Sequence, residues 1–142
     1  MNSLIFNSQP AHIDPSLPGP ENILRTQLSN GITILSRANF NSPSVVVQGY
    51  LTAGSISELE GKLGLAGFTA SSLLRGTEEL DFQQIFDALE SVGASLYFSG
   101  GTHITSFGGK ALVEDLDLLL KLITQSLRQP TFPNEHVERL RA

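Results

Sequence analysis

The chain of 142 residues contains no cysteine and no tryptophan. The absence of cysteine excludes disulfides, thiolate zinc sites and cysteine nucleophiles. Basic residues are also scarce, because nine Lys and Arg face fourteen Asp and Glu and the net charge is −5. Proteins that bind nucleic acid or anionic membranes usually carry a basic excess, and we therefore expect neither partner.

Long apolar runs are missing as well. No segment approaches the roughly 20 apolar residues that a membrane-spanning helix needs. Residues 1–20 lack the basic start, apolar stretch and cleavage site of a secretory signal. These absences lead us to expect a cytoplasmic protein. With 40% hydrophobic residues, the chain is long enough for one domain with an ordinary core.

The two ends of the chain differ in character from its middle. Four prolines within residues 10–20, next to Asn and Ser, predict an extended arm over residues 1–22. A packed domain is predicted over residues 23–142. The last residues, NEHVERLRA, form a charged helical pattern with no stop signal. We therefore expect the domain to continue beyond residue 142 in the natural protein.

Local patterns predict a mixture of strands and helices. Asn30-Gly31 lies between β-branched segments, which is typical of a hairpin, here over residues 23–37. Strands are predicted at 44–52, buried on both faces, and at 95–99 and 102–107; helices are predicted at 63–74, 82–92 and 116–127, with a fourth opened by Pro133. Asp81 and Gly93 are the expected caps of the second helix. This order favours an α+β fold with a mostly antiparallel sheet and helices packed on one face.

The chemical inventory of the sequence is small. Its three histidines are His12, His103 and His136, and none has a second metal ligand at the i and i+4 spacing of a helical zinc site. Glu135 and Arg139 have that spacing, but they are expected to form a solvated ion pair. An enzyme built around His103 would need an acid or base partner, and the sequence nominates none nearby.

The order of five motifs nevertheless resembles a known family. Those motifs are NGITIL, VVVQGYLTAGSISE, GLAGFTASSLLRGTEEL, ALESVGASLYF and LRQPTFPNE. Their order and spacing are similar to those of the pitrilysin/insulinase family of zinc metallopeptidases, which includes the mitochondrial processing peptidases. The resemblance is collinear from about Leu28 to the end of the chain. It implies a pitrilysin/insulinase-like metallopeptidase domain, of which this segment is the first part.

Active members of the family carry an H-x-x-E-H motif in which two His bind zinc and the Glu activates water. The resemblance places Gly67 at the first His, Ala70 at the Glu and Ser71 at the second His, whereas the flanking residues 64–66 and 76–77 match the family pattern. None of these three side chains replaces the lost chemistry, because a neutral hydroxyl is a poor zinc ligand. The family's third ligand, a later Glu, would align just past residue 142. We therefore expect no metal, no cofactor and no catalytic residue in this chain.

A second departure concerns the edge strand to which active members bind peptide by strand addition. The resemblance places Tyr97 and Phe98 where the family has Asn-Ala near the centre of that strand. The two aromatics could alter or block the peptide-binding edge. They could also be ordinary strand residues, one packed and one exposed, and this is the interpretation that the alternating pattern favours.

The resemblance implies a non-catalytic subunit or domain of a processing-peptidase-like zinc metallopeptidase. Such a chain would be inactive by itself and would help to form a peptide-binding chamber, with zinc held only by an active H-x-x-E-H-bearing partner. Its expected partners are that relative and a peptide substrate, and exposed surface on the isolated chain could drive self-association. The alternative is a stand-alone interaction or scaffold domain that reuses the peptidase fold.

Overall fold

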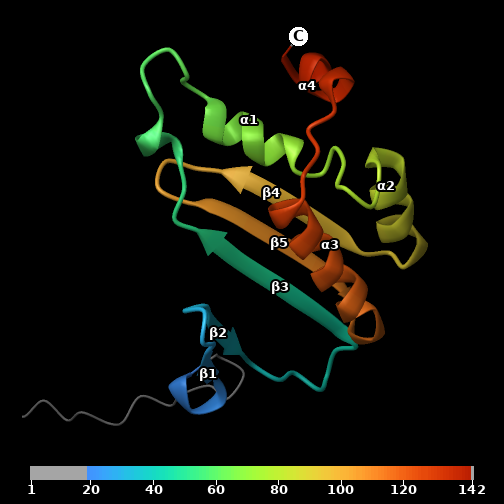
Figure 1. The fold of residues 1–142 in the computed structure, drawn as a ribbon. Helices are drawn as coiled ribbons and strands as arrows, with labels where there is room; N and C mark the ends of the chain where they lie inside the picture. Colours follow the sequence, from blue (N-terminus) through green and yellow to red (C-terminus); the bar gives the residue numbers. More distant parts are fainter. Residues whose placement is uncertain (1–18, 142) are drawn as a thin grey trace, which may run out of the picture. The chain divides into compact units, whose positions relative to one another are not determined.

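The computed structural model describes residues 19–141 of the chain (Figure 1). Most of the predicted arm, residues 1–18, lies outside these described residues, and Pro20–Asn22 form a short 3-10 turn, η1. The described part of the chain divides into two compact units, one that ends at residue 41 and one that begins at residue 42.

The first unit contains the predicted hairpin. Strand β1 (Leu24–Gln27) pairs antiparallel with β2 (Thr33–Ser36). At the turn, the N–H of Leu28 donates to the carbonyl of Ile32 at 2.8 Å, and Gly31 has a φ of 89°. This left-handed conformation is one that glycine adopts without steric cost, so the Asn30-Gly31 turn is confirmed.

The second unit contains a three-stranded antiparallel sheet with the order β3-β5-β4. Its elements are β3 (Ser44–Leu51), α1 (Leu65–Ser72), α2 (Phe82–Ser91), β4 (Ser95–Gly100), β5 (Thr105–Leu112), α3 (Leu116–Arg128) and α4 (Asn134–Arg141), with 3-10 turns η2 (Ser55–Ser57) and η3 (Val113–Asp115). These elements confirm the α+β fold class. No helix among residues 19–141 is long and apolar enough to cross a membrane.

The core of this unit lies between one face of the sheet and helices α2 and α3. Two buried clusters form it: Ile85, Leu89 and Leu122 in one, and Ala111, Leu119 and Ile123 in the other. Helix α2 begins as predicted, with the Asp81 carboxylate accepting the N–H of Gln84 at 2.8 Å, and Gly93 follows its end with a φ of 62°.

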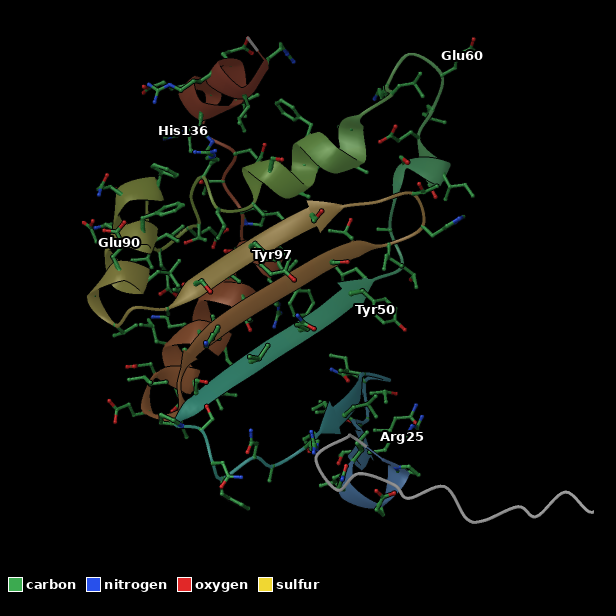
Figure 2. The ribbon with its side chains drawn as sticks, turned by 180° about the vertical axis from the view of Figure 1, so that it is seen from behind. Arg25, Tyr50, Glu60, Glu90, Tyr97 and His136 are labelled. Atoms are coloured by element: carbon green, nitrogen blue, oxygen red, sulfur yellow. The ribbon has the colours of Figure 1, made fainter. Side chains whose placement is uncertain are left out.

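Strand β3 differs from its prediction, because burial on both faces was wrong. Val45 and Val47 pack against the α3 side of the core, whereas Val46 and Tyr50 on the other face are 60% and 65% exposed. Figure 2 shows this second face of the sheet from behind, with the side chain of Tyr50 on it. Helices of the described residues pack on one face only, and the apolar run of β3 did not reveal this.

The bounds predicted for β5 were also wrong. The strand begins at Thr105, since residues 101–104 form the turn after β4, and it continues through two glycines to Leu112. Those glycines are accommodated because neighbouring side chains cover them. The ring of Tyr97 lies over Gly108, and Leu119 lies over Gly109. A strand interior with two glycines is weak by itself and depends on this packing.

Candidate functional site

Helix α1 lies beside β4, and the two elements meet in backbone contact (Figures 1 and 2). A Cβ atom built on Gly100 would lie 2.5 Å from the carbonyl oxygen of Ala66 and 2.8 Å from the backbone nitrogen of Gly67. Only glycine permits an approach this close. The contact places α1, and with it Gly67, Ala70 and Ser71, next to β4.

The three positions share one side of α1, but they differ in exposure. Gly67 and Ser71, one turn apart, are exposed, and Ser71 Oγ donates to the carbonyl of Gly67 at 2.9 Å. Ala70 is turned into the unit and only 3% exposed. A Cβ on Gly67 would meet no heavy atom within 4 Å, so the helix has room for a larger side chain at that position.

These residues do not fit a zinc ion. Gly67 has no side chain, Ala70 offers a methyl group, and the neutral Ser71 hydroxyl is bonded to its own helix. Zinc sites in proteins are built from imidazole, thiolate and carboxylate ligands. Among residues 19–141, no group of three or more His, Asp and Glu side chains could hold a metal ion.

The residues on either side of these three positions have structural roles that need no metal. Gly64 begins α1 with a φ of 90°, which glycine adopts readily. After α1, Thr77 is buried, and its N–H donates to the carbonyl of Leu80 at 2.8 Å while its Oγ1 accepts the N–H of Leu80 at 3.0 Å. These contacts hold the turn into α2.

Sequence reasoning missed the carboxylate of Glu58, which bonds to the backbone at the start of α1. Glu58 accepts the N–H of Gly64 at 2.8 Å and the N–H of Ala66 at 2.7 Å. Just before it, the N–H groups of Ser55 and Ile56 donate at 3.0 Å to the carbonyls of Gly101 and Thr102 in the turn after β4. The available signal was an acidic residue upstream of a helix whose N-cap, Gly64, has no side chain.

The aromatic pair predicted at the edge strand lies on β4. This strand pairs with β5 on one side, and its other side is unpaired among the described residues. The ring of Tyr97 lies over Gly108, whereas Phe98 is half-buried on the opposite face, with its ring centroid 6.3 Å from that of Phe107. Strand side chains project to the two faces, so neither residue is directed along the hydrogen-bonding direction of the unpaired edge.

A shallow hollow lies on the face that the described helices leave open. It has a volume of about 290 Å³, and its lining carries no charged side chain. The lining residues are Gln48, Gly49, Tyr50, Tyr97, Ile104, Ser106 and Phe107. Figure 2 shows Tyr50 and Tyr97 on this face. The hollow draws on three strands, and their register could not be derived from local sequence patterns.

The histidines are dispersed. His103 lies in the turn after β4, and His136 lies on α4 with its ring centroid 5.0 Å from that of Phe82. The Arg75 guanidinium, in the turn after α1, lies 4.8 Å from the centroid of the same Phe82 ring and connects this turn to α2. His12 lies outside the described residues. The two described histidines therefore share no site.

Comparison with known proteins gives consistent matches. The family model described as "Insulinase (Peptidase family M16)" matches residues 33–142. The chain is 27% identical over 129 residues to the mitochondrial-processing peptidase subunit beta of Saccharomyces cerevisiae, covering 91% of the chain and 27% of that relative. It is 28% identical over 120 residues to an uncharacterized zinc protease of Rickettsia bellii, and this match covers 82% of the chain and 28% of that relative.

A solved structure has the same fold. It is described as a peptidase M16 inactive domain from Pseudomonas fluorescens, and it superimposes with a TM-score of 0.76 at 22% identity. The match covers 84% of this chain and 29% of that one. The chain therefore spans less than a third of the length of each of these similar proteins.

Proposed function

The chain belongs to the insulinase family of peptidases, family M16, and on this basis we propose that it is a non-catalytic subunit or domain of a processing-peptidase-like zinc metallopeptidase. It helps to form the chamber that binds a peptide, and an active partner performs the zinc-dependent cleavage. The chain by itself cleaves nothing.

The observation that carries this proposal is the combination of an intact α1 with three side chains that lack metal chemistry. The helix lies against β4, and its flanking turns are held by hydrogen bonds. At Gly67, Ala70 and Ser71, however, there is neither an imidazole to bind zinc nor a carboxylate to activate water. A non-catalytic partner needs the fold of the family but does not need the zinc ligands.

Two of the similar proteins support this proposal. One is by name a subunit of a processing peptidase, and the solved structure of the same fold is described as an inactive domain. Zinc belongs, in this proposal, to a relative that carries the complete H-x-x-E-H motif. The present chain contributes surface, and a fold can serve that purpose after its catalytic residues are lost.

The surface proposed to receive peptide is the unpaired edge of β4. An extended peptide can add to such an edge through backbone hydrogen bonds, which supply affinity without charged side chains. Tyr97 and Phe98 project to the two faces and leave that edge accessible to a backbone. The peptide would lie next to α1, because Gly100 at the end of β4 touches the first turn of that helix.

Peptide binding without cleavage tests this proposal. A fluorescent peptide is titrated with the full-length protein, binding is followed by anisotropy, and peptide length is then checked by mass spectrometry. We expect binding, an uncut peptide and no stoichiometric zinc in the purified protein. The control peptide carries N-methyl groups on alternate backbone amides and should bind weakly. Stoichiometric zinc with cleavage by the chain alone would overturn the proposal, and an uncut peptide that never binds would favour the scaffold alternative.

A further inference from the structure

Helix α1 begins without a cap of its own. Its N-cap is Gly64, which has no side chain, and the first turn contains no acidic residue. The first N–H groups of a helix lack partners within the helix. Glu58 supplies hydrogen-bond acceptors from outside the helix, because its two carboxylate oxygens accept the N–H groups of Gly64 and Ala66 at 2.8 and 2.7 Å. A carboxylate in this position is also favoured by the positive end of the helix dipole.

The segment that carries Glu58 is fixed at its other end to the β4–β5 turn. Ser55 and Ile56 donate their N–H groups to carbonyls of residues 101 and 102, both at 3.0 Å. A Cβ on Gly54 would lie 2.4 Å from the carbonyl oxygen of Thr102, so this contact too is between backbones. Residues 54–58 therefore connect the turn that follows β4 to the first turn of α1.

The rest of the connection provides little further restraint. Within residues 59–63, Leu59 and Leu63 are 69% and 86% exposed, and the backbone bond of Lys62 to Leu59 is local. Gly61 and Gly64 both have positive φ values, and a Cβ on either would meet nothing within 4 Å. A link between two such glycines can bend, which leaves the Glu58 carboxylate as the contact that holds its two ends together.

We propose that Glu58 is a positioning residue. It holds the first turn of α1 against the C-terminal end of β4 and thereby sets the spacing between α1 and the unpaired edge of that strand. The consequence for peptide binding rests on the proposed function, whereas the effect on spacing does not. Without the carboxylate, the backbone contact of Gly100 with Ala66 is the remaining link at the first turn, and this end of α1 can move away from β4 while Ala70 and Ser72 keep the other end buried.

A distance measurement tests the spacing directly. Because the chain contains no cysteine, Thr69→Cys on α1 and Lys110→Cys on β5 give two unique spin-label sites, both exposed. We expect Glu58→Gln to broaden the distance distribution between them, since Gln offers one acceptor oxygen where two N–H groups need partners. The matched control is Glu60→Gln, two residues away, whose carboxylate makes no hydrogen bond to the described residues.

Hydrogen exchange supplies a second reading. In Glu58→Gln, the amides of Gly64 and Ala66 should exchange at least about tenfold faster, because each loses or weakens a bond to a charged group. If Glu58→Gln does not fold, Glu58→Asp, which keeps the charge but shortens its reach, is measured instead and should broaden the distribution as well. Unchanged distances and unchanged exchange in the folded variant would overturn the positioning role.

The outcome for peptide binding separates this inference from the proposed function. A broadened distance distribution together with weaker peptide binding supports both. A broadened distribution with no peptide binding by either the wild type or the variant supports the role of Glu58 and contradicts the peptide edge.

Discussion

Gly100 of β4 and Ala66 of α1 are in backbone contact, because a Cβ on Gly100 would lie 2.5 Å from the Ala66 carbonyl oxygen. The main chains therefore fix the closest possible separation of helix and strand at this point, with no side chain between them. This leaves no room for adjustment by repacking. This contact and the hydrogen bonds of Glu58 keep the helix that carries Gly67, Ala70 and Ser71 next to the edge strand.

Two glycine substitutions should have opposite effects. Gly100→Ala forces the α1 backbone away, and we expect it to lower the free energy of unfolding by roughly 1–3 kcal/mol. Gly67→Ala has open space around its new methyl group, and alanine favours a helix over glycine by about 0.5–1 kcal/mol. Urea unfolding of both variants measures the difference. Equal stabilities would contradict the backbone contact.

A histidine pair should create part of a metal site on α1. Gly67→His with Ser71→His places two imidazoles one turn apart on the exposed side of the helix, the spacing that zinc sites use. We expect zinc binding by isothermal titration calorimetry, which the wild type should lack. The control, Thr69→His with Ser71→His, has the same number of histidines at a spacing that does not converge, and equal affinity in the two variants would show that the geometry of α1 is irrelevant.

The Glu79–Lys121 ion pair should leave a small signature in the acid range. Its Nζ–Oε2 distance is 3.1 Å, and the hydrogen bond from Lys121, with a further one from Gln125, holds the pKa of Glu79 below its ordinary value of 4.5. A carboxyl group whose pKa is lowered in the folded state stabilises the fold at pH values above its ordinary pKa. This stabilisation is lost as the pH falls through the lowered pKa. Lys121→Met should raise the pKa of Glu79 in an NMR titration, with little change in stability because the pair is exposed.

Two buried serines provide a test of the core. Ser126 Oγ is fully buried and has no hydrogen-bond partner among the described residues, whereas Ser72 Oγ, equally buried, donates to the carbonyl of Phe68 at 2.8 Å. Ser126→Ala should raise the free energy of unfolding by about 1 kcal/mol, because a buried hydroxyl without a partner is costly. Ser72→Ala should be neutral or lower it by about 1 kcal/mol. Thermal unfolding of the two variants distinguishes them.

The features that the sequence predicted best were those formed by residues close together in the chain. The caps of α2 could be predicted because Asp81 and Gly93 lie directly at the two ends of the helix. The bounds of β5 could not, because its two glycines are stabilised by Tyr97 and Leu119, which lie on other elements. The burial of β3 failed for a related reason, since its sequence does not state how many of its faces helices will cover.

The candidate site likewise combines positions that the sequence could suggest with contacts that only the fold shows. The assignment of Gly67, Ala70 and Ser71 to the zinc motif follows from the resemblance, because their flanking residues match the family pattern, and it stays a prediction. The contact of α1 with Gly100 and the hydrogen bonds of Glu58 are invisible to spacing rules, because they join residues whose separation follows no helical or strand period. They determine where α1 lies, and only the fold shows them.

Peptide cleavage by a mixture tests the central claim most directly. The full-length protein is combined with a family relative that carries H-x-x-E-H, and the cleavage rate is compared with that of each protein alone. We predict that the mixture cleaves faster than the two separate rates together, and that this chain alone has no activity. A relative that is equally active without this chain would contradict the account.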